Sequence, residues 1–313
     1  MELLIPAFYF PTQKILINHD ETLNQSILSH TDHHSLQVFK EPHLALDYLK
    51  NDYQPVFNST DLFEIEDHTE YYDLTTPHPI RINTQKMREI IYNKQCHEDI
   101  SVLIVNYPMN DRNDLKWLAP VHYPAIKRLL IIHDDAALAV AKKALQDGLI
   151  HAYLKQDDPE FSQKLAHTIQ ELAWRYFLEL SHLILSTSIE TDDFSYLMNP
   201  AVFSFFKNFL KEEMIQSFCL IYKFGNFLLL DEKGNKHYFI VRNKKHLKQL
   251  AEAAKKDHSS KEIIQNLAEG SVVPFFGEEK GFWDVPAKDW GKYLHPANPI
   301  PNENDFIYYS TRA

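Results

Sequence analysis

Ile100-Ser101-Val102-Leu103-Ile104-Val105-Asn106-Tyr107 is the stretch of sequence that decides the fold of the first half of the chain. Apart from Ser101, every residue before Asn106 is apolar. A largely apolar strand of this kind is typical of the centre of a parallel sheet, where both faces of the strand are buried. Asn106 follows this apolar run, at the carboxyl end of the expected strand, where open α/β sheets form their crevices.

The segments around this strand alternate between short apolar strands and helices with three- to four-residue apolar periodicity. This alternation predicts a receiver-like, flavodoxin-like α/β domain: a doubly wound parallel five-stranded sheet with helices on its faces. Residues 51–83 are polar, aromatic and acidic, so we interpret them as an insertion, and a helix is expected to follow them at 84–94. The other expected strands are 14–18, 36–39, 129–132 and 152–154, and the expected helices are 20–29, 42–49 and 135–146.

Beyond this domain, Asp158-Pro159 opens a long helix with an apolar seam, because proline is well tolerated in the first turn of a helix. We expect the seam to pack on the chain's own domains or to join two copies in a homodimer. From residue 191 the sequence predicts a smaller α+β domain with an antiparallel sheet. The expected organisation is a receiver-like domain at 1–160, a connecting helix at 161–190 and a C-terminal output domain at 191–313.

Composition limits the classes of function. The 313 residues carry a formal net charge of −11, which opposes nucleic-acid binding because phosphate neutralisation drives most of that affinity. No apolar run is long enough to span a membrane, and Glu2 and Pro6 argue against a secretory signal. The two cysteines, Cys96 and Cys219, suggest neither a disulfide framework nor a zinc ribbon. We therefore expect a cytoplasmic protein without a cofactor and without a membrane partner.

Several motifs resemble the receiver domain of two-component response regulators. Val105-Asn106-Tyr107-Pro108-Met109 resembles the third strand, which carries the phosphorylated aspartate, and Leu154–Pro159 resembles the end of the fifth strand. Leu228–Asp231, Pro274-Phe275-Phe276 and Leu294–Ala297 extend the resemblance to proteobacterial response regulators with a poorly characterised C-terminal domain, such as quorum-sensing regulators of Legionella. The resemblance implies a signalling protein of the phosphorelay type.

The resemblance also implies a phosphorylation pocket, and most of its reactive positions have changed. A working receiver holds Mg²⁺ with two acidic residues, attacks phosphorus with an aspartate, and binds the phosphoryl oxygens with a Thr or Ser and a Lys. Of the two residues at the acidic positions, only Asp20 is a carboxylate. The corresponding residues here are His19 and Asp20 for the acidic pair, Asn106 for the nucleophile, His133 for the Thr or Ser, Gln156 for the Lys, and Tyr153 at the aromatic switch position.

Alternatives at this pocket stay open. Asp111, in the loop after Asn106, is a second candidate nucleophile. His19, Asp20 and His133 all follow strand ends, so two imidazoles and a carboxylate are candidate ligands for a transition metal, although solvent-facing histidines are the simpler interpretation. Lys155 keeps a positive charge beside Gln156, but alternation along a strand points its side chain the other way.

The favoured hypothesis is a non-enzymatic signalling protein whose receiver-like domain is a degenerate (pseudo) receiver that docks protein partners without phosphorylation. The alternative is that the C-terminal domain is a nucleotide-binding, nucleic-acid-binding or enzymatic output module regulated by the first domain. The aromatic residues Trp283, Trp290 and Tyr293 suggest either a binding groove or core packing, and the lysines around 244–248 suggest either phosphate binding or a solvated helix face. With only seven glycines in the chain, we identify no glycine-rich phosphate loop.

Overall fold

The computed structural model describes residues 4–28, 35–56, 62–65, 80–108, 115–119, 125–182, 195–222, 224–278 and 284–312. Two compact units are formed, each from more than one stretch of the chain. The receiver-like unit comprises residues 11–58 and 93–180, and the second unit comprises residues 1–10, 59–92 and 181–313. The chain therefore passes from one unit to the other four times.

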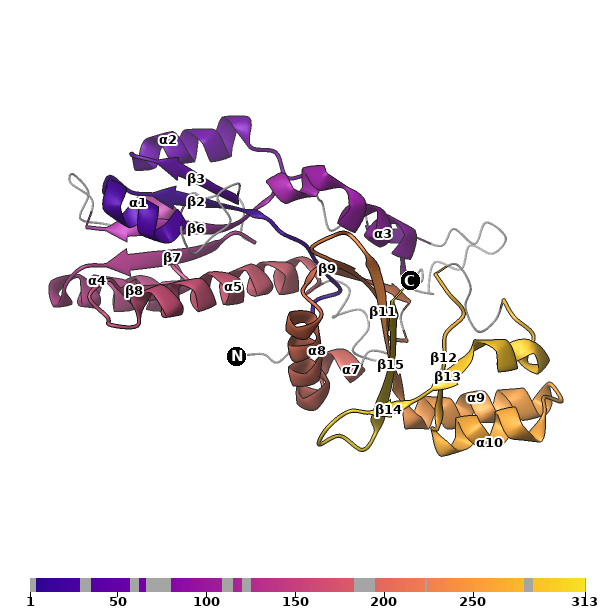
Figure 1. Ribbon diagram of the computed structural model, residues 1–313. Helices are drawn as coiled ribbons and strands as arrows, with labels where there is room; N and C mark the ends of the chain where they lie inside the picture. Colours follow the sequence, from indigo (N-terminus) through magenta and orange to yellow (C-terminus); the bar gives the residue numbers. More distant parts are fainter. Residues whose placement is uncertain are drawn as a thin grey trace, which may run out of the picture. The chain divides into compact units, whose positions relative to one another are not determined.

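The receiver-like unit contains a five-stranded parallel sheet in the order β3-β2-β6-β7-β8, which confirms the predicted fold class (Figure 1). The central strand β6 is buried at every position, as its apolar sequence predicts. The five strands are β2 (Gln13–Ile17), β3 (Leu36–Phe39), β6 (Ile100–Tyr107), β7 (Lys127–Ile132) and β8 (Ala152–Lys155). The helices are α1 (Glu21–Leu28), α2 (Pro42–Asp47) with the π-helical turn η2 (Tyr48–Asp52), α4 (Asp135–Gln146) and α5 (Phe161–Leu180), with short 3-10 helices η4 (Lys94–Glu98) and η5 (Lys116–Leu118).

Two hydrophobic cores form because successive side chains of a strand point to opposite faces of the sheet. Ile15 and Ile17 pack in one core with residues of α2 and α4. Leu16 packs in the other core with residues of α1 and α5. The seam of α5 is thus buried within its own unit, and the whole helix belongs to this unit rather than forming a separate connection at 161–190.

The second unit is built on a six-stranded sheet in the order β1-β9-β10-β11-β15-β14, in which every pair is antiparallel. Its strands are β1 (Phe8–Tyr9), β9 (Ile215–Tyr222), β10 (Asn226–Asp231), β11 (Lys236–Asn243), β14 (Asn298–Pro299) and β15 (Phe306–Arg312). Small pairs of strands are formed by β4 (Phe63–Ile65) with β5 (Ile80–Ile82), and by β12 (Val272–Pro274) with β13 (Leu294–Pro296). The helices are α3 (Thr84–Tyr92), α7 (Ser195–Met198), α8 (Pro200–Glu212), α9 (Lys244–Lys256), α10 (Lys261–Glu269) and the 3-10 helix η7 (Ala287–Tyr293).

Helices cover both faces of this antiparallel sheet. Phe206 of α8 packs against Phe218, Phe227 and Phe239, with ring centroids 5.0 to 5.2 Å apart. On the other face, Ile240 packs in a core with Leu247 of α9 and residues of α10 and η7. This unit is the α+β domain with an antiparallel sheet that the sequence predicts for the C-terminal part of the chain. Among the described helices, none combines the length and the apolar character required to cross a membrane.

The extent of this unit differs from the expected range of 191–313 because two distant segments complete it. Phe8 of β1 pairs with Cys219 at the edge of β9, and Phe8 is fully buried. Helix α3 packs on β9, with Met87 and Ile91 buried. Residues 1–10 and the helix after the proposed insertion therefore belong to the second unit, not to the receiver-like one.

We predict that a fragment of residues 191–313 lacks a cooperative thermal unfolding transition, because losing β1 and α3 exposes the apolar surface of β9. A fragment of residues 11–180 in which a short glycine-serine linker replaces 59–92 retains its whole sheet and should unfold cooperatively. Circular dichroism melting of the two fragments measures both outcomes. A cooperative transition in the 191–313 fragment would contradict the structural grouping of residues 1–10 and 59–92.

Candidate functional site

The carboxyl ends of β2, β6, β7 and β8 lie along one edge of the parallel sheet, because all neighbouring strands run in the same direction. Asn18 follows β2, Asn106 is near the end of β6, His133 follows β7 and Gln156 follows β8. The topology therefore gathers polar side chains from well-separated parts of the sequence, at the place where open α/β sheets bind ligands.

Asn106 lies at the centre of a hydrogen-bonded network at this edge. Its Nδ2 donates to Oδ1 of Asn18 at 2.7 Å, and its Oδ1 lies 2.7 Å from Nε2 of His133. Asn18 in turn donates from Nδ2 to Oδ1 of Asn24 at 2.8 Å. Asn106 is 8% exposed and Asn18 1% exposed, so the centre of the network is shielded from water. The network ties β7, β6, β2 and α1 together through neutral amide groups and one imidazole.

One backbone group fixes the orientation of every side chain in this network. The backbone N–H of Asp20 donates to Oδ1 of Asn18 at 3.1 Å, and a backbone N–H can only donate. The oxygen of Asn18 therefore faces Asn106, which must offer its NH₂ group in return. The oxygen of Asn106 is then left for His133, so Nε2 of His133 carries the proton and donates it.

This arrangement has direct chemical consequences at position 106. A neutral amide is not an anionic nucleophile, so it cannot form the acyl phosphate on which a receiver switch depends. Mg²⁺ prefers carboxylate and water oxygens in near-octahedral geometry. The amide oxygens of Asn18 and Asn106 are both engaged as hydrogen-bond acceptors, so a cation would have to displace these hydrogen bonds.

The side chains of His19 and Asp20 make their polar contacts away from Asn106. Nε2 of His19 lies 3.6 Å from Oε1 of Glu41. Oδ1 of Asp20 accepts from the backbone N–H of Thr22 at 2.8 Å and so caps the start of α1. His19, Asp20 and His133 are not gathered as a ligand set, and no group of three His, Cys, Asp or Glu side chains within the described part of the chain could hold a metal ion.

At the end of β8, the positive charge of Lys155 is already paired with carboxylates. Nζ of Lys155 forms ion pairs with Asp135 at 3.1 Å and Asp157 at 3.0 Å, and its hydrogen bonds to these carboxylates raise the pKa of Lys155. Oε1 of Gln156 is buried and has no hydrogen-bond partner among the described residues. Tyr153 is half-buried and packs against the core formed with α2 and α4.

The structure thus brings together Asn106 and His133, as the sequence predicts, and adds Asn18 and Asn24, which sequence reasoning missed. The position of Asn18 is the clue that was available: it directly follows the apolar residues of β2, much as Asn106 follows those of β6. Asp111, the alternative nucleophile, and Trp283 lie outside the described residues.

Comparison with known proteins supports the fold. No protein-family model matches the chain, and no curated protein matches it significantly. Among solved structures, the response regulator LqsR of Legionella pneumophila is similar over 100% of this chain and 91% of its own, with a TM-score of 0.77 and 24% sequence identity. The chain therefore shares the fold of this response regulator, and the resemblance expected from the sequence is confirmed at the level of fold.

Two further solved structures match only part of the chain. An adenylate cyclase from Rhodopirellula baltica covers 57% of this chain and 98% of its own, at 13% identity and a TM-score of 0.38. The signal receiver domain of an HD domain-containing protein from Pseudomonas fluorescens Pf-5 covers 54% of this chain and 91% of its own, at 16% identity and a TM-score of 0.35. Both TM-scores are too low to bear on fold or function.

We predict that Asn106→Asp lowers the free energy of unfolding by about 1–3 kcal/mol, because a carboxylate oxygen would face Oδ1 of Asn18 where an N–H now donates. Asn93→Asp is the matched control: Asn93 is exposed and caps η4, a role that Asp performs equally well, so its effect should stay within about 0.5 kcal/mol. Urea denaturation at neutral pH measures both variants. Equal stability of the two would contradict the assigned network.

Proposed function

We propose that this protein is a response-regulator-like signalling protein that acts without phosphorylation, through contacts with protein partners. The observation that carries the proposal is the amide of Asn106, held between Asn18 and His133 at the position where the resemblance to receivers expects the nucleophile. Position 106 lacks a nucleophilic carboxylate, Lys155 is held by two carboxylates, and the residue at the expected lysine position is Gln156. These features support a degenerate pocket that stays in one state.

The protein in this proposal is cytoplasmic and non-enzymatic, with a receiver-like unit that serves as a docking surface rather than a switch. The response-regulator fold supports a place in a signalling pathway. A homodimer is retained as a prediction, but the apolar seam of α5 cannot provide its interface while Leu165, Ile169 and Leu172 are buried in their own unit. Any contact between copies would have to use another surface.

Treatment with acetyl phosphate or beryllium fluoride in the presence of Mg²⁺ should leave the mass, the melting temperature and the oligomeric state unchanged. The reason is that the acyl phosphate cannot form without an attacking carboxylate. Intact-mass spectrometry, thermal melting and light scattering measure the three properties, and a receiver that retains its aspartate is the positive control. A stable phospho-adduct, at Asp111 or elsewhere in the receiver-like unit, would refute the proposed phosphorylation independence.

Restoring carboxylates tests whether Asn18 and Asn106 occupy the metal-binding and nucleophile positions of a receiver. In the variant Asn18→Asp/Asn106→Asp, two carboxylates replace groups that are now 2.7 Å apart, so their repulsion should be relieved by Mg²⁺. We predict that millimolar Mg²⁺ raises the melting temperature of this double variant by several degrees and leaves that of the wild-type protein and of either single variant nearly unchanged.

Addition of His133→Thr and Gln156→Lys to the double variant should then permit labelling by acetyl phosphate, because a hydroxyl and a cation become available for the phosphoryl oxygens. Peptide mapping should place the phosphoryl group at position 106. A folded quadruple variant that neither binds Mg²⁺ nor accepts phosphate would show that Asn18 and Asn106 do not occupy the metal and nucleophile positions.

A further inference from the structure

A cavity of about 210 Å³ lies in the second unit, where the end of α8 meets the last residues of β15. Because directly paired residues point to the same face of a sheet, Arg312 of β15 lies on the same face as His237 of β11. The volume exceeds the roughly 150 Å³ of a cavity that holds benzene, so a ring with a short arm fits. Among the residues that line the cavity are Phe209, Glu213, His237, Ser310 and Arg312.

A buried imidazole forms part of the polar side of this cavity. His237 is 3% exposed, and its Nε2 lies 3.5 Å from Oδ2 of Asp231. A hydrogen bond from the side chain of Asn235 is the main reason that the pKa of Asp231 is lowered to about 2, so this carboxylate is ionised and can only accept. Nε2 of His237 therefore carries a proton, and in the neutral ring Nδ1 is an acceptor.

Further acceptors lie beside Nδ1 of His237. That nitrogen is 3.8 Å from Oε2 of Glu213, which is too far for a hydrogen bond, and the same oxygen accepts from Nη2 of Arg312. Oε1 of Glu213 and Oγ of Ser310 make no hydrogen bond with any residue in the part of the chain that the structure describes. The cavity therefore presents three groups that can each accept a further hydrogen bond.

The charges around the cavity suit a cationic donor. Two carboxylates, Glu213 and Asp231, stand against the single guanidinium of Arg312, so one negative charge is left unbalanced. The side chain of Arg312 is 74% exposed, so water solvates the rest of its guanidinium. An ammonium group has three N–H donors, which matches the three acceptors. The ring of Phe209 provides an apolar wall for the body of the ligand.

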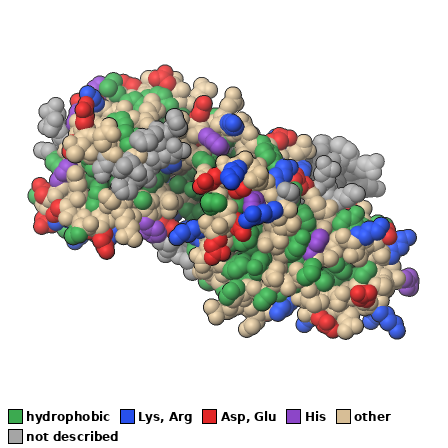
Figure 2. Space-filling model, viewed as in Figure 1, with side chains coloured by type: hydrophobic (Ala, Val, Ile, Leu, Met, Phe, Trp, Pro, Cys, Tyr) green, Lys and Arg blue, Asp and Glu red, His purple; other side chains and the backbone are tan. Residues whose placement is uncertain are grey.

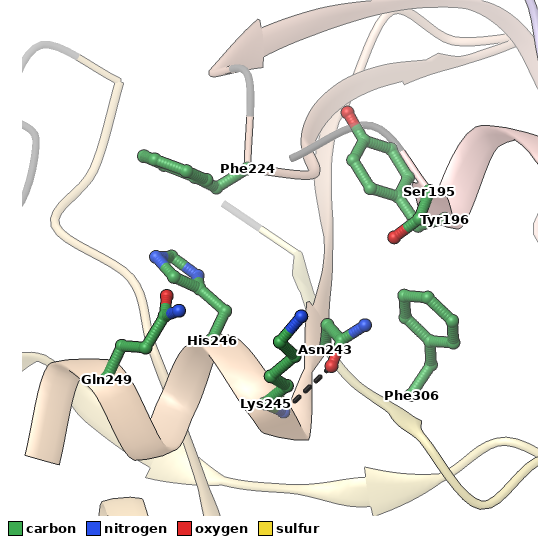
Figure 3. Close-up of a pocket in the computed structure, with 8 residues that line it drawn as sticks. All are labelled: Ser195, Tyr196, Phe224, Asn243, Lys245, His246, Gln249 and Phe306. Carbon is green, nitrogen blue, oxygen red and sulfur yellow. Dashed lines mark hydrogen bonds between the residues drawn. The ribbon is translucent and has the colours of Figure 1, made fainter. Parts of the chain in front are cut away.

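The pocket at the start of α9 is a weaker candidate for a ligand site (Figure 3). Its volume is about 40 Å³, and Phe224 and His246 stack with ring centroids 4.4 Å apart, so each ring already covers a face of the other. Lys245, Ser195 and Tyr196, which also line it, already have partners. The cavity at the end of α8 is larger and keeps acceptors that are not yet engaged.

We propose that the cavity at the end of α8 binds a small primary amine, with its ammonium group between Glu213, His237 and Ser310 and its apolar body against Phe209. This inference goes beyond the proposed function, because it assigns a small-molecule site to the second unit. It does not depend on whether the receiver-like unit is phosphorylated.

Short-range hydrogen bonds, rather than long-range attraction, select the ligand in this proposal. On the face of the molecule shown in Figure 2, acidic and basic side chains are interspersed, so no field of one sign dominates there. Inside the cavity, an alcohol offers one donor in place of three, and a carboxylate offers none. Ligands that share one body and differ in this group alone should therefore differ in affinity.

Titration of the nitrogen-15-labelled full chain tests this proposal, with the backbone amide NMR signals of Ser310 and Thr311 as the readout. The probes are phenethylamine, 2-phenylethanol and 3-phenylpropanoate, which carry an ammonium, a hydroxyl and a carboxylate on the same body. We expect phenethylamine to bind in the millimolar range at neutral pH. The other two probes should bind at least about tenfold more weakly, since hydrogen bonds between charged groups are the stronger kind.

Variants locate the ammonium group. Glu213→Gln keeps the shape of the side chain and removes its charge, so phenethylamine should bind about tenfold more weakly. The matched control Glu252→Gln removes the same charge from an exposed position on α9 and should bind like the wild type. Ser310→Ala is a milder change that keeps the ion pair of Glu213 with Arg312, and the loss of one acceptor should weaken binding about threefold. Melting curves confirm that each variant is folded.

Four results would overturn the amine site. The first is that phenethylamine leaves the signals of Ser310 and Thr311 unchanged, and the second is that 2-phenylethanol binds as tightly as phenethylamine. The third is tighter binding of 3-phenylpropanoate, which would indicate an anion held by Arg312. The fourth is an equal effect of Glu213→Gln and Glu252→Gln on the binding of phenethylamine.

Discussion

The hydrogen bond from Asn106 to Asn18 is the interaction on which the account of this protein depends. Its direction is set by the backbone N–H of Asp20, which leaves Oδ1 of Asn18 as an acceptor and obliges Asn106 to donate. Burial makes that direction costly to reverse, since a buried polar group left without a partner costs about 1–3 kcal/mol. Formation of an acyl phosphate would need a carboxylate in place of Asn106, and the present network is complementary to a neutral amide instead.

The parallel sheet brings Asn18, Asn106 and His133 to one edge because its strands all run in the same direction. Alternation along β2 sends Ile15 and Ile17 to one core and Leu16 to the other, so the strand is anchored on both faces and its end is held in place. The second unit is completed by β1 and α3, which come from before and within the receiver-like sequence. The two units are therefore interleaved in sequence, and neither corresponds to a single continuous stretch of the chain.

Local sequence patterns predicted the strands and helices of the parallel sheet, the position of α5, and an antiparallel sheet in the C-terminal part of the chain. They missed β15, because Phe306–Arg312 follows a proline-rich tail and its partner strand β11 lies about 70 residues earlier. The pairing of Phe8 with Cys219 was beyond such patterns for the same reason. At the site, resemblance directed attention to His19 and Asp20, and the structure adds Asn18, which directly follows β2 and lies beside Asn106.

Nitrogen-15 NMR of the His133 side chain tests the central claim most directly, because the whole network fixes which ring nitrogen carries a proton. The account predicts a proton on Nε2 whose hydrogen bond to Oδ1 of Asn106 shifts the nitrogen resonance, and loss of that shift in Asn106→Ala, where the accepting oxygen is removed. A neutral His133 ring with its proton on Nδ1 and a bare Nε2 would contradict it, since Asn106 would then donate to His133 and could not also donate to Asn18.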